Sequence, residues 1–166
     1  MNYLALYDFI EDISQNLNQT VKFFHGRKEM LNLTSEFDSL YVFCLPFTSN
    51  GTMVGGAQIN ETWQVNLIFY MMDRPDSAID QNDQDVMQAE IRTLTITEES
   101  ANRFIRLVHG NTIDNSLEAA AEKLTITSFT KGNAIKDTAQ LLTGTVLTLN
   151  IIVPDDFNYC SLANLA

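Results

Sequence analysis

The sequence predicts an α+β domain in which a single, mostly antiparallel sheet is packed by an N-terminal helix and a long central helix. Segments 63–72 and 145–153 alternate like central strands, and segment 86–109 repeats apolar residues at helical spacing without Gly or Pro. The 166 residues, of which 45% are hydrophobic and 19% charged, are enough for one domain with its own core. We expect residues 1–166 to form this domain, with 154–166 as a C-terminal extension.

The first helix is predicted over residues 3–17, because apolar side chains recur there every three or four positions. The side chains expected to face the core are Leu4, Tyr7, Ile10, Ile13 and Leu17. The acidic side chains expected to face away from it are Asp8, Glu11 and Asp12.

The central helix is predicted over residues 86–109, with Gly110 in the left-handed conformation that ends many helices. The segment Thr93–Thr97 contains β-branched residues, which favour strands, and Thr97 is also a suitable cap for a second helix. Two interpretations therefore stay open, one continuous helix or two helices divided near Thr93–Thr97.

Five segments are predicted to be strands, one of which runs through Leu124, Ile126 and Phe129 and leads to a turn at Lys131–Ala134. Val21–Phe24 is short, and Ser39–Phe47 is almost continuously apolar. Trp63–Met72 carries apolar side chains on both faces, which is typical of a strand covered on both sides. Thr145–Val153 has the clearest alternation in the chain, and Pro154 ends it.

The connections between strands are predicted from turn residues. Asn50-Gly51 is a hairpin-turn signal, and Gly55-Gly56 lengthens the connection, so that 49–60 is predicted to be a loop. Lys131–Ala134 is expected to be a second hairpin turn. Segment 73–85 is polar and acidic, and we expect a solvated loop there.

Composition limits the partners of the chain. Ten Lys and Arg residues against 21 Asp and Glu residues give a formal charge of −11, which disfavours specific nucleic-acid binding and anionic membrane surfaces. The N-terminus lacks the basic region of a signal peptide. The two cysteines, Cys44 and Cys160, provide neither a disulfide framework nor a metal spacing, and we expect a reducing cytoplasm.

No motif predicts catalysis, a cofactor or a metal. His25 and His109 are the only histidines, and no nucleophile elbow accompanies them. The segment from Asp80 resembles a calcium loop but has Asp85 where Gly is required and Ile91 where a bidentate Glu is required. We therefore expect a protein that is not an enzyme. The alternative is a small cytoplasmic enzyme or ligand-binding protein with a cryptic site in a cleft between sheet and helix.

Uncharged segments outside the predicted core are the candidates for protein contacts. The loop 49–60 and the tail 157–166 are both partly apolar, whereas a monomer is expected to expose charge there. The residues expected at an interface are Trp63, Phe157, Tyr159 and Leu162.

The last strand runs through Leu141–Cys160, and the central segment Trp63–Pro75 is predicted to be a sheet strand. This order of elements resembles the tail-completion and tail-terminator proteins of tailed bacteriophages. The resemblance spans most of the chain and is one of pattern. It implies a virion structural protein that forms a homo-oligomeric ring as a tail terminator or head–tail connector. It also implies self-association, contacts with other phage tail or neck proteins, and assembly in the host bacterial cytoplasm.

A ring through which DNA passes benefits from a surface that repels phosphates, which fits the acidic composition. The acidic residues expected to line or flank a DNA channel are Asp76, Asp80, Asp83 and Asp85. The alternative is that they face solvent outside the ring. A monomeric bacterial adaptor is a third reading of the same sequence.

Overall fold

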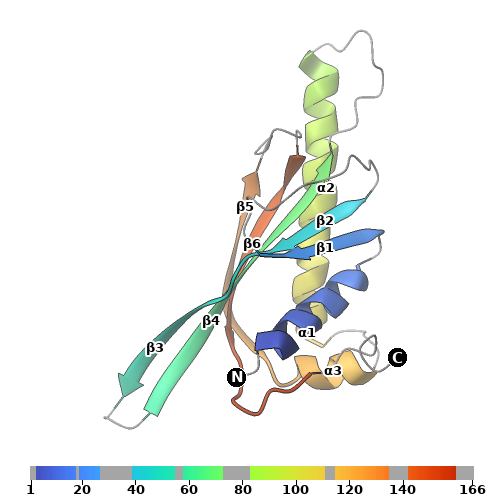
Figure 1. Cartoon of the computed structure of the whole chain (residues 1–166). Coiled ribbons are helices and arrows are strands. Elements are labelled where there is room, and N and C mark those ends of the chain that lie inside the picture. The colour runs from blue at the N-terminus through green and yellow to red at the C-terminus, as the bar shows by residue number, and fades with distance from the viewer. Residues whose placement is uncertain are drawn as a thin grey trace.

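The computed structural model describes residues 3–17, 19–26, 39–54, 58–72, 83–110, 115–134 and 142–159. Within these ranges it contains a six-stranded, mostly antiparallel sheet with helices packed on it (Figure 1). The predicted α+β class is therefore confirmed.

The sheet has the strand order β1-β2-β4-β6-β5, and β3 pairs with β4 outside this path. The strands are β1 (Val21–His25), β2 (Leu40–Cys44), β3 (Thr48–Val54), β4 (Gln58–Met72), β5 (Thr125–Ala134) and β6 (Leu142–Ile152). β1 and β2 are parallel, and the other pairs are antiparallel. The two strongest predicted strands, β4 and β6, are the central neighbours, as expected.

Helices α1 (Tyr3–Gln15), α2 (Asp83–Val108) and α3 (Asn115–Ala121) share one apolar core with one face of the sheet. α1 and α2 match the predicted helices, whereas α3 was not predicted. The core side of α1 is centred on Leu6, Phe9 and Ile13, which are fully buried. Leu4 is 65% exposed, so its predicted place in the core is wrong.

The opposite face of the sheet carries a second apolar cluster. Tyr41 and Phe43 of β2 lie there with Ile68 and Tyr70 of β4, and all four are buried. The prediction that β4 is apolar on both faces is confirmed, because Leu67 and Phe69 lie in the helix-side core.

α2 is one continuous helix through Thr93–Thr97. The hydroxyl groups in this region donate to carbonyls of the preceding turn, as Thr95 Oγ1 does to the Ile91 carbonyl at 2.8 Å. Such bonds satisfy the hydroxyl groups within an intact helix. Gly110 has φ +79°, which is the predicted left-handed end of the helix, and its N–H donates to the Leu107 carbonyl at 3.0 Å.

Two predicted turns are strands. Asn50 and Gly51 lie inside β3, opposite Thr62 and Glu61 of β4, so most of the predicted 49–60 loop is a β-hairpin. The segment Lys131–Ala134 continues β5 instead of turning. In both places strand pairing with a long neighbour overrides a local turn signal.

Candidate assembly interface

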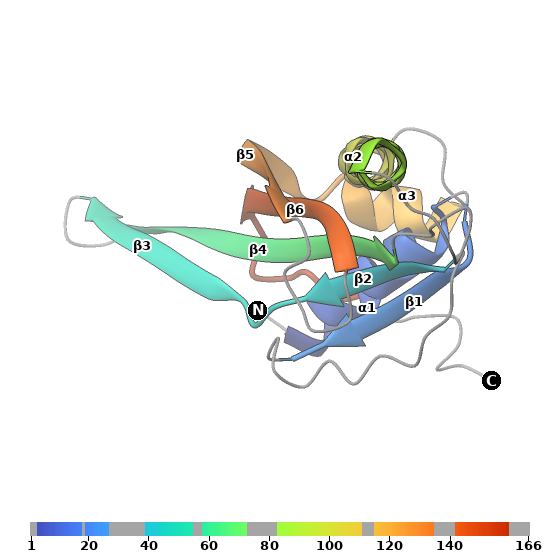
Figure 2. The ribbon, with the colours of Figure 1, turned by 90° about the horizontal axis from the view of Figure 1, so that it is seen from above.

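The most prominent feature of the molecule is a two-stranded arm, which we define as β3 together with residues 58–62 of β4. The pairing of β4 with β6 ends at Trp63 and Ile151, whereas its pairing with β3 continues to Val54 and Gln58. The arm therefore leaves the sheet as a ribbon that points away from the body, as the two views show (Figures 1 and 2).

The arm has little support of its own within the chain. An isolated two-stranded hairpin is at best marginally stable in water, and stability comes from further strands or a packed face. Thr48, Ser49, Asn50 and Gly51 are all exposed. On the described residues, both outer edges of the ribbon lack a strand partner. Such a ribbon is stabilised when another molecule covers it.

The composition of the arm differs from that of the rest of the surface. Between positions 48 and 62 the only charged residue is Glu61, in a chain of which 19% is charged, and Pro is absent. Exposed strand edges are usually protected by charged residues, Pro or short length. The arm has no Pro, and its one charged residue is Glu61.

The base of the arm is fixed to the body by aromatic contacts with α1. The ring of Trp63 packs edge-on against Tyr3, with centroids 5.2 Å apart, and Phe47 stacks on Tyr7 at 4.1 Å. Trp63 is only 5% exposed. The prediction that Trp63 anchors an interface is therefore corrected, because its indole is buried within the chain and holds the arm at its base.

The C-terminal segment packs into the core as far as Tyr159. Phe157 and Tyr159 are 2% and 8% exposed, and both rings contact Phe9 edge-on, with centroids 5.8 and 5.5 Å apart. Tyr159 Oη also donates to Asp12 Oδ2 at 2.7 Å. Both were expected at an interface in an extension beginning at 154, and for the described part of that segment this is wrong. Leu162 lies outside the described residues.

The acidic candidates for a DNA channel fall into two groups. Asp76 and Asp80 lie outside the described residues. Asp83 and Asp85 belong to the first turns of α2 and not to a loop. Acidic residues at this position are typical of helix starts, because the N-terminal end of a helix dipole is positive.

A second strand edge is exposed on the body. β5 is the last strand in the sheet order, and every residue from Thr127 to Asn133 is exposed, including Phe129 at 49%. Its only charged residue is Lys131. The Lys131 ammonium lies 2.9 Å from Glu98 Oε1 and 2.8 Å from Asn102 Oδ1, so this side chain is held on α2.

The N-terminal half of α2 extends beyond the sheet (Figure 1). Met87 and Ile91, one helical turn apart, are 56% and 55% exposed. Side chains four residues apart share one side of a helix, so these two form a small apolar stripe. The stripe is a further exposed apolar surface.

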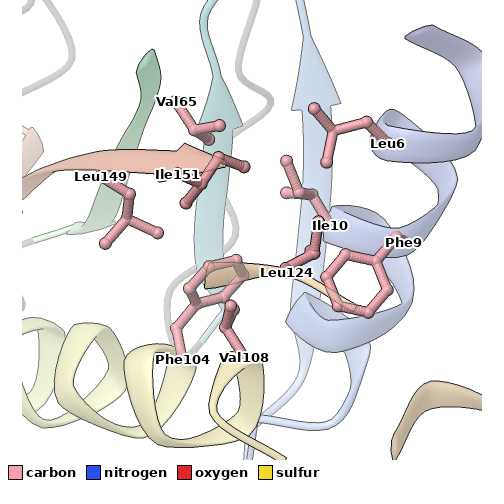
Figure 3. Close-up of a pocket in the computed structure, with 9 residues that line it drawn as sticks. All are labelled: Leu6, Phe9, Ile10, Val65, Phe104, Val108, Leu124, Leu149 and Ile151. Atoms are coloured by element: carbon pink, nitrogen blue, oxygen red, sulfur yellow. The ribbon is translucent and has the colours of Figure 1, made fainter. Parts of the chain in front are cut away.

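A small apolar pocket lies between the sheet, α1 and α2 in the described part of the chain (Figure 3). It is lined by Leu6, Phe9, Ile10, Val65, Phe104, Val108, Leu124, Leu149 and Ile151. It has room for about one water molecule, and the side chains that line it are all apolar. This pocket is a packing defect in the core and too small for an organic ligand.

Glu11 of α1 interacts with Asp12, Asp8 and His25, and burial together with the neighbouring Asp12 carboxylate raises the pKa of Glu11. Cys44 is buried in β2, and burial raises the pKa of its thiol to about 12, so the thiol is protonated at neutral pH. His25 and His109 are both exposed and belong to different elements. Within these ranges, no three His, Cys, Asp or Glu side chains gather as metal ligands would.

None of the helices in the described ranges has the length and hydropathy that a membrane span needs. No protein-family model matches the chain, and no curated protein sequence matches it.

Proposed function

We propose that this protein is a structural subunit that assembles with copies of itself through the β3–β4 arm. The observation that supports the proposal most strongly is the arm itself, an almost uncharged ribbon with two open edges that projects from a body of high negative charge. Copies carrying −11 each repel one another, so contacts form most readily where acidic residues are few.

The particular assembly that we propose is the ring of a tail terminator or head–tail connector of a tailed bacteriophage. The resemblance in element order and in the two central strands supports this reading, as does an acidic surface from which DNA is repelled. In this role the protein is not an enzyme. It resides in the virion and contacts other tail or neck proteins.

Sedimentation velocity of the full chain and of a variant with a shortened arm tests self-assembly. Residues 52–60 are replaced by Asn-Gly, which joins Gly51 to Glu61, two residues that face each other across the hairpin. Asn-Gly is the preferred two-residue hairpin turn, so the shortened arm keeps its register. We expect the full chain to form oligomers and the shortened chain to stay monomeric with an unchanged unfolding midpoint.

A full chain that stays monomeric at every concentration contradicts self-assembly. The phage assignment has its own test, which is the identity of the neighbouring genes. Capsid, portal and tail genes beside the coding sequence support it, and a neighbourhood without them contradicts it.

A further inference from the structure

The arm of one subunit needs an acceptor on the next, and we infer that this acceptor is the outer edge of β5, to which β3 of a neighbouring copy adds as an extra strand. The inference rests on the proposed self-assembly and names the partner surface. Strand addition of this kind gains affinity from main-chain hydrogen bonds and requires an open, unprotected edge on both sides.

β5 has the properties of such an edge. After the irregularity between Ile126 and Ser128, its pairing with β6 is regular from Ser128 to Ala134, which is seven residues, the length of β3. The segment contains no Pro and no acidic residue. It is therefore an exposed, regular edge of the kind that pairs with other chains.

Among the residues of β5 itself, the one charged side chain does not protect this edge. Lys131 is bonded to Glu98 and Asn102 on α2, so its ammonium is directed to the helix and not across the open side of the strand. Phe129, half exposed on the same strand, offers apolar surface to an incoming ribbon.

The other open edges are poorer acceptors. β1 has only five residues and carries Lys22 and His25. Pairing between two arms leaves the edge of β5 exposed in the assembly. In both views β5 lies on the body and the arm points away from it, so one chain does not close the contact on itself (Figures 1 and 2).

An arm that binds a different surface on the next copy makes a head-to-tail contact. Such contacts repeat around a ring when the rotation between subunits closes, and otherwise they produce a filament. Each subunit then has one donor and one acceptor, and this asymmetry makes the inference testable by mixing variants.

The acceptor variant carries Phe129→Lys and Thr130→Lys, which place a charge on each face of the edge while leaving the arm intact. The matched control carries Gln15→Lys and Thr20→Lys, which add the same charge at exposed positions on α1 and before β1. Both variants lower the negative charge of the chain by the same amount. If the acceptor variant loses assembly and the control does not, repulsion between whole subunits is not the cause.

Sedimentation velocity is measured for each chain and for an equal mixture of the acceptor variant with the shortened-arm chain. We expect the control to assemble like the original chain and each of the two variants to remain monomeric. Their mixture is expected to form a heterodimer and nothing larger, because only one intact arm and one intact edge are present. The heterodimer also shows that both variants are folded.

Different failures have different meanings. If the shortened-arm chain is monomeric while the acceptor variant assembles normally, self-assembly through the arm stands and the β5 acceptor is wrong. If both are monomeric and the mixture forms no heterodimer, the contact is not between arm and β5 and the inference is overturned. If the original chain never associates, the proposed function itself fails.

Discussion

Gly144 shows how a single residue sets the spacing of the central strands. A Cβ atom at this position meets the Phe69 carbonyl oxygen, with the Phe69 carbonyl carbon 2.8 Å and Tyr70 Cδ1 2.9 Å away. The obstacle is backbone of the neighbouring strand, which cannot rotate away as a flexible side chain does. Glycine is therefore required here by close approach of β4 and β6 and not by an unusual φ.

Replacing this glycine tests the packing of the two strands. We expect Gly144→Ala to lower the free energy of unfolding by about 1–3 kcal/mol, the usual cost of overpacking a core. Gly132→Ala is the matched control, because Gly132 lies on the adjacent strand with no atom within 4 Å of its added Cβ. Equal denaturation midpoints for the two variants contradict the close approach.

Two threonines connect α2 to the sheet at residue level. Thr97 Oγ1 and Thr145 Oγ1 are 3.0 Å apart, and both side chains are buried. We expect Thr97→Val to cost about 1–3 kcal/mol, because Thr145 loses a buried partner, whereas the double variant with Thr145→Val costs less than the sum of the two single variants. Additive effects in a double-mutant cycle followed by chemical denaturation contradict this contact.

At the scale of elements, periodicity predicted the long and repetitive segments well. α1, α2, β2 and β6 were predicted close to their observed bounds, because each has a sustained apolar pattern, whereas β4 begins at Gln58, before the predicted Trp63. The arm was missed because Asn50-Gly51 and Gly55-Gly56 are strong local turn signals, and pairing with residues 58–64 decides the structure instead. α3 is seven residues long, too short for a clear period.

The candidate site was predicted less well than the fold. Trp63 was chosen at the boundary between a predicted loop and a strand, and Phe157 and Tyr159 were chosen in an uncharged tail. Contacts with distant α1 residues bury all three. Segment 49–60 was predicted to be a loop, whereas its described residues form a strand ribbon, and its contact with neighbouring copies stays a prediction. Sequence patterns report local order, whereas burial of an irregular segment depends on long-range packing.

The C-terminal segment is expected to behave as a core element and not as a removable tail. Phe157→Ala removes a buried ring that packs on Phe9, and we expect a loss of about 3–5 kcal/mol. Asn158→Ala, at an exposed neighbouring position, is the control. Thermal unfolding of the two variants measures the difference, and similar midpoints indicate that the segment contributes little to the core.

At the scale of the whole molecule, charge determines the response to nucleic acid. With 21 acidic against ten basic residues, we expect no measurable binding of duplex DNA at physiological salt, because non-specific affinity requires several phosphate contacts by Lys and Arg. Fluorescence anisotropy with a labelled duplex checks this at two salt concentrations. Saturable binding of the duplex that weakens as salt rises contradicts this prediction. It indicates a local basic patch on a chain whose net charge is negative.

In the proposed assembly, the same charge favours the arm as the place where copies meet. The body is acidic, the arm and the outer edge of β5 are almost uncharged, and both present unpaired strand edges in the described chain. Assembly is expected to strengthen as salt rises, because screening reduces the repulsion between bodies while main-chain hydrogen bonds at the edges persist.

Amide hydrogen exchange at several protein concentrations tests the central claim most directly. In dilute solution the amides of β3 are expected to exchange quickly, because an exposed two-stranded ribbon opens easily. As concentration rises, we expect slower exchange in Thr48–Val54 and in Ser128–Ala134 together, with unchanged exchange in the central strands β4 and β6 between residues 63–72 and 142–151. Exchange in Thr48–Val54 that stays fast while the protein is shown to be oligomeric contradicts assembly through the arm.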